Sequence, residues 1–426
     1  MSKGLWGPIS FAVPVAKTLR LMGIRWAQAS AMDDGRASRV VLGVSLNVLL
    51  LGLVSFITDV SSEMIHPILP GFVEVLGATA LAVGLVGGLG DLMQNILKAP
   101  SGYLSDRTGR RKALTAAGYA ISAVSKLFIP FSGSWPQVMA LRALERTGKG
   151  VRTAPRDALI AESGGKRGRA FGIHRALDTL GAVVGSLAAL ALLLANIPMR
   201  DIMLYGALVA FLALIPLAFV EETGRKRREG ARPRRSAGGL SPGFKRFVLV
   251  ASLFGLSNMT YMLFILFVLQ FVQPPWGLDP LVFATALYVV FNIFYAALSA
   301  PAGALSDRVG RKTVIALGYL VFALTCLGLA LHQRVPLVPA VIGLFCLYGV
   351  SKALVDGTQR AYASDLAPAE ARGYALGIFH TCVGFASLAS GALTGLIWDL
   401  VGAPWAFLSA AILSAISALL LMALCD

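Results

Sequence analysis

Charged residues are scarce in this sequence, and their scarcity excludes a soluble globular protein. They make up 14% of the 426 residues, whereas hydrophobic residues make up 56% and the mean hydropathy is +0.73. Soluble domains carry about a quarter charged residues. A soluble fold of this length could not bury so much apolar surface, so the surrounding solvent must be lipid. Apolar runs of about 20 residues, enough to cross a bilayer, recur along the chain. We therefore predict an integral membrane protein that has the lipid bilayer as a partner.

Cysteine and histidine are rare as well, with four of each in the chain. The cysteines show neither CxxC spacing nor the spacing of metal ligands, which indicates small core residues rather than disulfides or a metal site. The chain has neither the Gly-x-x-x-x-Gly-Lys-Ser/Thr motif of ATP-hydrolysing proteins nor the HExxH motif of zinc proteases. We therefore expect a protein that is not an enzyme and that needs no metal or cofactor.

Acidic residues are outnumbered by basic ones, and the excess of bases predicts an orientation in the membrane. The chain has 38 Lys and Arg against 22 Asp and Glu, a net charge of +16. The bases lie between apolar runs and no nucleic-acid-binding motif is present, so we expect no nucleic acid partner. Cytoplasmic loops are rich in Lys and Arg, which predicts the cell (inner) membrane with both termini cytoplasmic. The predicted inner loops hold Arg107 to Lys112, Lys166 to Arg169, Arg225 to Arg246, Arg308 to Lys312 and Arg372.

Twelve apolar runs are long enough for transmembrane helices. They lie at about 41–66, 78–101, 113–131, 136–160, 170–195, 201–220, 245–271, 280–302, 313–332, 337–361, 373–398 and 403–424. We predict an all-α membrane protein with six-helix bundles at 40–220 and 245–426, joined by a basic cytoplasmic linker at 221–244. Residues 1–39 form a cytoplasmic arm, either an amphipathic helix on the membrane or a disordered tail.

The two predicted bundles repeat each other in sequence. GYLSDRTGRRK, which begins at Gly102, recurs as GALSDRVGRKT at Gly303, and RGRAFGI at Arg167 recurs as RGYALGI at Arg372. The two offsets are 201 and 205 residues, so chance does not explain the pair of matches. Duplicated halves around a site near the bilayer midplane are a common design of secondary transporters. The halves are therefore expected to be related by pseudo-symmetry.

The repeated pattern, G-x-L-x-D-R-x-G-R followed by Arg or Lys, resembles the signature of the major facilitator superfamily. The resemblance implies the fold of that family and alternating access by two rocking six-helix domains. It also implies a conformational latch, although the same residues could serve only to fix the topology. Physically, glycines allow close helix approach and a positive-φ turn, and the acid can bond arginine. The expected gate residues are Gly102, Asp106, Arg107, Gly109, Arg110, Asp307 and Arg311.

Charges inside the apolar runs indicate a polar cavity. The fourth run carries Arg142, Glu145, Arg146, Lys149 and Arg152 within one helical arc of about 140°. Charges within membrane spans usually face the protein interior or a water-filled pathway. They could instead snorkel near the helix end or neutralise each other in structural pairs. The expected residues of a substrate or proton cavity are Asp59, Glu63, Asp91, Arg142, Glu145, Arg146, Lys149, Arg152, Arg175, Asp178, Asn258, Asn292, Lys352 and Asp356.

These features predict a secondary transporter of a small-molecule substrate, acting by alternating access as a monomer. An acid beside a base in a partly dry cavity can change protonation, so we expect a proton gradient as the energy source. Two Gly-x-x-x-Gly runs, at Gly181 and Gly391, predict close helix packing. They weakly resemble a glycine motif of drug-proton antiporters, which favours efflux. Uptake or exchange of an organic anion or a metal chelate is the alternative, because the bases suit carboxylate and phosphate. A further alternative is a non-transporting sensor with the same fold.

Overall fold

The computed structural model describes residues 40–41, 44–163, 167–223, 240–332, 337–368 and 371–425, and the predicted arm at 1–39 lies outside them. The first half comprises β1 Val40–Val41, β2 Val44–Ser45, α2 Leu46–Ile65, α3 Leu69–Val75, α4 Ala80–Thr108, α5 Arg111–Phe128, η1 Ile129–Phe131, α6 Trp135–Glu162, α7 Arg167–Leu194, α8 Met199–Leu212 and α9 Leu214–Ala218. The second half comprises α10 Pro242–Ser257, α11 Tyr261–Phe271, η2 Pro275–Gly277, α12 Pro280–Val309, α13 Arg311–Leu331, α14 Val338–Asp365, α15 Arg372–Val401 and α16 Ala403–Leu424.

The predicted fold class is confirmed, since each of the twelve apolar runs corresponds to helix. Within the described residues, eleven helical segments are long and apolar enough to cross a membrane. The remaining run, the fourth along the chain, is α6. It spans 28 residues, but its many charges keep its hydropathy below that limit. The structure adds a short hairpin before the first helix, in which the two-residue strands β1 and β2 pair antiparallel.

Two membrane spans contain a break, the first at the point where the sequence predicted its end and the seventh in its middle. The first divides at His66–Ile68 into α2 and α3, where Pro67 removes a backbone donor. The seventh divides at Asn258–Thr260 into α10 and α11, where Thr260 Oγ accepts from the Met262 amide at 3.4 Å. Because α3 extends the first span to Val75, Glu63 lies near the middle of that span.

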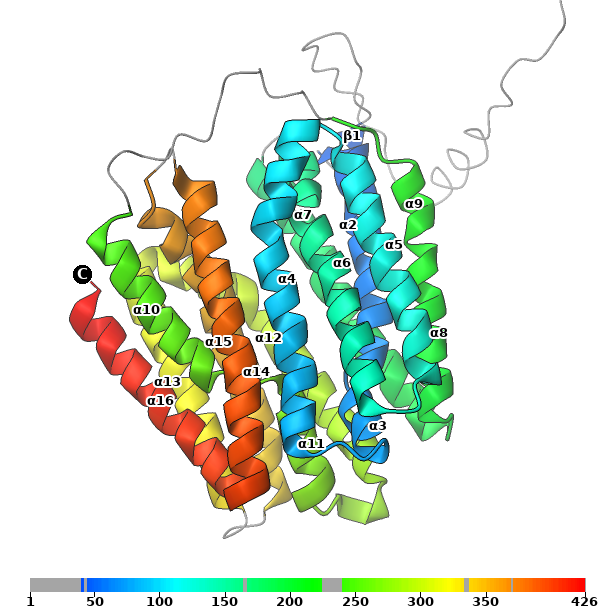
Figure 1. Cartoon of the computed structure of the whole chain (residues 1–426), viewed down its shortest axis with the longest axis vertical. Coiled ribbons are helices and arrows are strands. Elements are labelled where there is room, and N and C mark those ends of the chain that lie inside the picture. The colour runs from blue at the N-terminus through cyan, green and yellow to red at the C-terminus, as the bar shows by residue number, and fades with distance from the viewer. Residues whose placement is uncertain are drawn as a thin grey trace, which may run out of the picture.

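The two halves meet mainly along α4 and α15, which run side by side in Figure 1, and along α7 and α12. Glycines make the first contact close: a Cβ on Gly84 would fall on the Gly391 carbonyl, and one on Gly395 would meet the backbone at Ala80 and Leu81. Within the first half, Gly181 and Gly185 pack in the same way on the backbone of α2. The close packing predicted from the two Gly-x-x-x-Gly runs is therefore confirmed.

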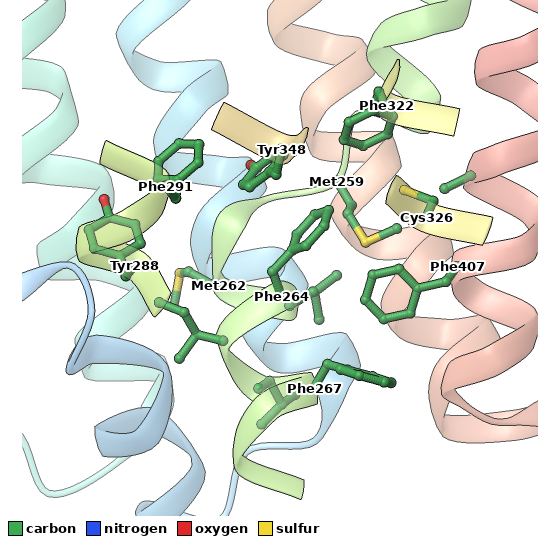
Figure 2. Packing of buried hydrophobic residues seen from close by; sticks show 14 of the residues in the cluster. Met259, Met262, Phe264, Phe267, Tyr288, Phe291, Phe322, Cys326, Tyr348 and Phe407 are labelled. Carbon is green, nitrogen blue, oxygen red and sulfur yellow. The ribbon is translucent and has the colours of Figure 1, made fainter. Parts of the chain in front are cut away.

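Aromatic rings fill the core of the second half, around α11, the second helix of the broken seventh span. Phe264 on α11 stacks on Tyr348 with ring centroids 4.2 Å apart and meets Phe407 edge-on at 5.4 Å (Figure 2). Phe291 stacks on the same tyrosine at 4.6 Å. Offset and edge-on ring pairs stabilise beyond their buried area by about 0.5–1.5 kcal/mol. Tyr348 is thereby fixed between two helices next to the centre of the protein.

The two ends of the bundle differ in how the halves are joined. We call the end with residues 107–112 and 308–312 the basic end and the opposite one the far end. At the far end, α11 packs on α3 and α4, and Gln270 donates to Glu74 at 2.7 Å. The Asp399 carboxylate accepts from the amides of Ala80 and Leu81, both at 2.9 Å. Among the described residues, α2 and α10 show no comparable packing at the basic end, so the halves are sealed at the far end.

We predict that Gly84→Leu and Gly391→Leu each destabilise the protein, because the added side chain meets backbone and cannot be accommodated by a rotamer change. Overpacking of this kind costs about 1–3 kcal/mol. The measurement is the apparent Tm of purified protein in detergent. Gly343→Leu is the matched control, since a Cβ there meets nothing within 4 Å. Equal Tm values for Gly84→Leu and the control would show that the α4–α15 contact does not depend on the glycines.

Candidate functional site

A cavity of about 230 Å³ lies between the two halves, lined by residues of α2, α4, α6, α11, α12, α14 and α15 and by the break between α10 and α11. Its wall combines charged side chains with the tyrosines of the second half. The sequence-predicted residues that line it are Glu63, Asp91, Arg146, Lys149, Asn258, Asn292, Lys352 and Asp356. Predicted side chains from both halves of the sequence are therefore brought together at the centre.

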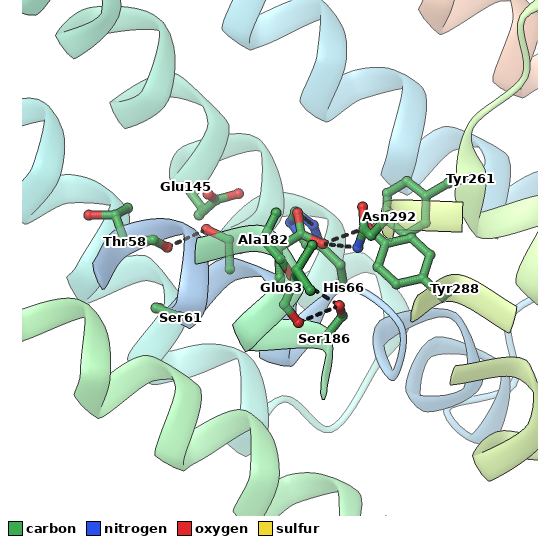
Figure 3. A network of polar contacts seen from close by, with 12 residues as sticks. Thr58, Ser61, Glu63, His66, Glu145, Ala182, Ser186, Tyr261, Tyr288 and Asn292 are labelled. Atoms are coloured by element: carbon green, nitrogen blue, oxygen red, sulfur yellow. Dashed lines mark hydrogen bonds and ion pairs between the residues drawn. The ribbon is translucent and has the colours of Figure 1, made fainter. Parts of the chain in front are cut away.

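Glu63 on α2 connects the two halves. One carboxylate oxygen accepts from Tyr288 at 2.8 Å and from Asn292 at 3.2 Å, both on α12 (Figure 3). The other lies 2.9 Å from His66 Nδ1 at the end of the same helix. The break after α2 turns the chain here, which places His66 between Glu63 and the guanidinium of Arg142. Three partners on one buried carboxylate make a fully engaged junction.

The charged residues in the first half of α6 form a buried ion cluster. Arg142 donates to Glu145 at 2.8 Å, and Arg146 lies 3.5 Å from the same carboxylate. Arg146 also donates to Gln94 on α4 at 2.8 Å, and Arg142 donates to Tyr261 of the other half at 3.5 Å. Glu145 is 1% exposed, so this acid is satisfied by protein and not by solvent. Buried charges of this kind require such pairing.

A second polar cluster lies around Asp178 on α7. Ser55 donates to one of its oxygens at 2.7 Å and Arg175 to the other at 2.8 Å. Arg175 continues across the interface to the hydroxyl of Tyr295 at 2.8 Å, and that hydroxyl donates to Asp356 at 3.3 Å. Asp59, one helical turn after Ser55 on α2, neighbours Asp178 and Lys149. The cluster thus contains two neighbouring carboxylates with different partners.

Six predicted cavity residues do not line the cavity. Arg152 points toward α5, where it donates to Ser122 at 2.8 Å and lies 4.3 Å from the centre of the Tyr119 ring. The prediction that Arg152 lines the cavity is wrong, because the polar arc of α6 is wide and the side that carries Arg152 packs on α5. The other five stand behind the cavity wall, in the two polar clusters: Asp59, Arg142, Glu145, Arg175 and Asp178.

Most of the expected gate residues lie in helices, because α4 and α12 run on to Thr108 and Val309, whereas Gly109 and Arg110 form the short connection between α4 and α5. Asp106 pairs at 3.4 Å with Arg111, which also pairs with Glu162. Arg110, another expected gate residue, is exposed. In the second half, Arg311 pairs with Asp307 at 3.3 Å and with Asp365.

Three other expected gate residues have simpler positions. Gly109 ends α4 with φ +66°, a positive value that favours glycine, and a Cβ on Gly102 would come within 3.3 Å of Ala154 on α6. Arg107 is exposed in the last turn of α4. The predicted positive-φ turn and close helix approach are confirmed, and the arginine that pairs with Asp106 is Arg111, which was not among the expected gate residues.

Sequence reasoning missed several residues of the site. Lys126 on α5 is 1% exposed and donates to Ser61 at 3.0 Å and to Ser62 at 2.8 Å. A lone lysine inside an apolar run was the available signal. His66, Gln94 and Tyr288 carried no such signal, since uncharged side chains inside a span are compatible with ordinary packing. Within the described residues, no group of three or more His, Cys, Asp or Glu could hold a metal ion.

The sequence contains one spacing typical of serine hydrolases, Gly239 to Gly243, with Ser241 at its centre. In the structure Ser241 begins a helix instead. Its hydroxyl accepts from the Phe244 amide at 3.1 Å and donates to the Leu366 carbonyl at 3.2 Å. The hydroxyl is thus used as a helix cap, so it supplies no nucleophile.

The chain is similar in sequence to known membrane transporters. The model of the major facilitator superfamily matches residues 51–286 and 249–425. An uncharacterized MFS-type transporter of Methanocaldococcus jannaschii is 42% identical over 383 residues, covering 89% of this chain and 95% of the relative. A multidrug resistance protein of Cronobacter sakazakii is 26% identical, covering 79% and 84%. A probable 4-methylmuconolactone transporter of Cupriavidus pinatubonensis is 27% identical, covering 76% and 74%.

The fold is shared with solved transporters. The crystal structure of a mutant nucleoside transporter superposes with a TM-score of 0.76 over 89% of this chain and the whole of that chain, at 14% identity. At this identity the likeness shows the fold alone. With a family model that matches almost all of the described residues, two pseudo-symmetric helical bundles and a polar cavity between them, the chain belongs to the major facilitator superfamily.

Proposed function

We propose that this membrane transporter couples the movement of a small solute to protons by alternating access of its two halves. The observation that carries the proposal is that Asp178 on α7 accepts from Ser55, one helical turn before Asp59 on α2, so that two acids lie at one helix contact inside the bundle. Two carboxylates can share a hydrogen bond only if one of them holds a proton. No cofactor is needed for this chemistry, because a proton gradient supplies the free energy.

The partners of the two acids favour Asp59 as the proton carrier. Asp178 already accepts hydrogen bonds from Ser55 and from the guanidinium of Arg175, so it is stabilised as an anion. Asp59 has no ion pair among the described residues and faces Lys149 at the cavity. A proton on Asp59 is therefore donated to Asp178, whereas its loss leaves a carboxylate that attracts Lys149. The protonation state changes what the cavity wall offers to a solute.

The inter-half contacts support a two-state mechanism. The hydrogen bonds of Asp399 and Gln270 hold the far end together, and the contact between α4 and α15 serves as the surface along which the halves turn. Following the excess of basic residues, we propose that the basic end faces the cytoplasm. The structure then corresponds to a state sealed toward the outside, and opening requires the loss of the Asp399 hydrogen bonds.

One observation favours export of the solute, and another favours its uptake or exchange. Export is favoured by the relative named a multidrug resistance protein and by the glycine runs of α7 and α15. Uptake or exchange of an organic anion is favoured by the bases that line the cavity. Flux measured in proteoliposomes with a pH gradient of either sign separates the two, because only the coupled direction accumulates the solute against its gradient.

We predict that Asp59→Asn removes the acceleration of flux by a pH gradient but keeps solute exchange, because exchange needs no net proton movement. The assay uses a panel of labelled organic acids, nucleosides and cationic dyes in proteoliposomes. Asp59→Glu should restore coupling in part. Asp201→Asn is the matched control, since Asp201 is exposed in the first turn of α8. Gradient-driven accumulation that persists in Asp59→Asn would contradict the assignment of the proton carrier.

We also predict that Asp399→Ala shifts the protein toward a state open at the far end. The substitution removes two charge-assisted hydrogen bonds that join the halves. Such bonds contribute about 1.5–3 kcal/mol, so the ratio of the two states should change roughly tenfold or more. The measurement is the distance between spin labels on exposed far-end positions of the two halves. Asp279→Ala is the control, because Asp279 caps only its own helix α12. Identical distance distributions in both variants would refute the far-end latch.

A further inference from the structure

Two lysines occupy the same position in the two halves of the protein. Lys149 is the fifteenth residue of α6 and Lys352 is the fifteenth residue of α14, and both helices are 28 residues long. Both side chains line the central cavity. In transporters of this design the two halves are related by an axis along the membrane normal. The two ammonium groups therefore face the same space from opposite halves, close to mid-depth.

Neither ammonium has a direct ion pair with the protein. Within the described residues, no carboxylate lies at ion-pairing distance from Lys149 or Lys352, and neither lysine has a side-chain hydrogen bond. Lys352 lies 5.9 Å from the centre of the Tyr348 ring, which the aromatic core holds in place. A cation over an aromatic face is oriented by the ring but keeps its charge available. An anion entering the cavity would remove the cost of two unpaired charges inside the membrane.

Two of the three acids of the cavity wall are hydrogen-bonded to the protein. The cavity is lined by three acids and three bases, apart from His66. Glu63 is bonded by His66, Tyr288 and Asn292, and Asp356 accepts from Tyr295. Asp91 has no ion pair or side-chain hydrogen bond among the described residues. The charges of the cavity wall without a direct partner are thus two lysines against one aspartate, and this excess of positive charge favours an anionic ligand.

The size of the cavity narrows the class of ligand. At about 230 Å³ it is smaller than the sites of drug-sized molecules, which run from about 300 to 1,000 Å³. A small organic acid fits this space better than a large amphipathic drug.

We propose that Lys149 and Lys352 form a single anion-binding site, one cation from each half, that takes a small organic carboxylate as the transported substrate. The proposal rests on the proposed transport function and specifies its substrate class. Because each half supplies one cation, the bound anion bridges the halves. Binding therefore depends on both lysines together, and loss of either one leaves half a site.

The test is ligand binding to the full chain purified in detergent, measured as the shift of Tm by benzoate, lactate, succinate and citrate. The neutral amides benzamide, lactamide and succinamide are the matched probes, and sodium chloride controls for ionic strength. We expect at least one carboxylate to raise Tm while its amide does not. Lys149→Gln and Lys352→Gln should each weaken that binding roughly tenfold or more. Lys245→Gln, at an exposed position of α10, should bind as the native chain does.

The double variant Lys149→Gln/Lys352→Gln gives a readout that needs no ligand. Removal of two unpaired buried charges should leave Tm unchanged or raise it, whereas removal of structural ion-pair partners lowers it. A lowered Tm or a chain that does not fold would overturn the proposal. So would the absence of a carboxylate-specific shift, or a shift retained in both single variants.

Binding and transport fail independently in this design. A protein that binds carboxylates through both lysines but shows no gradient-driven flux keeps the anion site and loses proton coupling. A protein that moves only nucleosides or cationic dyes under a pH gradient keeps the transport function and loses the anion site.

Discussion

The structure depends on how Glu63 is held at the centre of the membrane. A carboxylate in this position is costly unless its oxygens are bonded by protein. His66 from the end of the same helix and Tyr288 and Asn292 from the other half supply those bonds. His66 in turn contacts Arg142, which pairs with Glu145. Helices α2, α6 and α12 are therefore connected by one continuous polar network, and the cavity lies beside it.

The architecture could be predicted from the sequence because the bilayer imposes simple rules on it. Length and hydropathy marked every span, and α6 was recognised although its charges lower its hydropathy. The breaks in the first and seventh spans were harder to predict. Pro67 was visible in the sequence, but Asn258 to Thr260 contain no proline, and their break depends on packing that hydropathy does not describe.

The candidate site was predictable in composition but less so in arrangement. Helical periodicity placed Arg146 and Lys149 toward the cavity, as observed. The same arc included Arg152, which turns to Tyr119 and Ser122 on α5. A polar arc of this width contacts two neighbours, and only the neighbours' side chains decide between them. Alignment of the repeats likewise matched Arg110 with Arg311, whereas the structure gives the paired role to Arg111, the first residue of α5 as Arg311 is of α13.

Arg111 and Arg311 have a consequence for how the molecule can move. Arg111 joins the ends of α4, α5 and α6, and Arg311 joins the ends of α12, α13 and α14. Each arginine ties three helices of its own half and leaves the other half untouched. The rims of the two bundles are thus stiffened separately. If the protein opens at the basic end, the two halves would separate from each other as rigid bodies. The six helix ends that the two arginines join would stay together within each half.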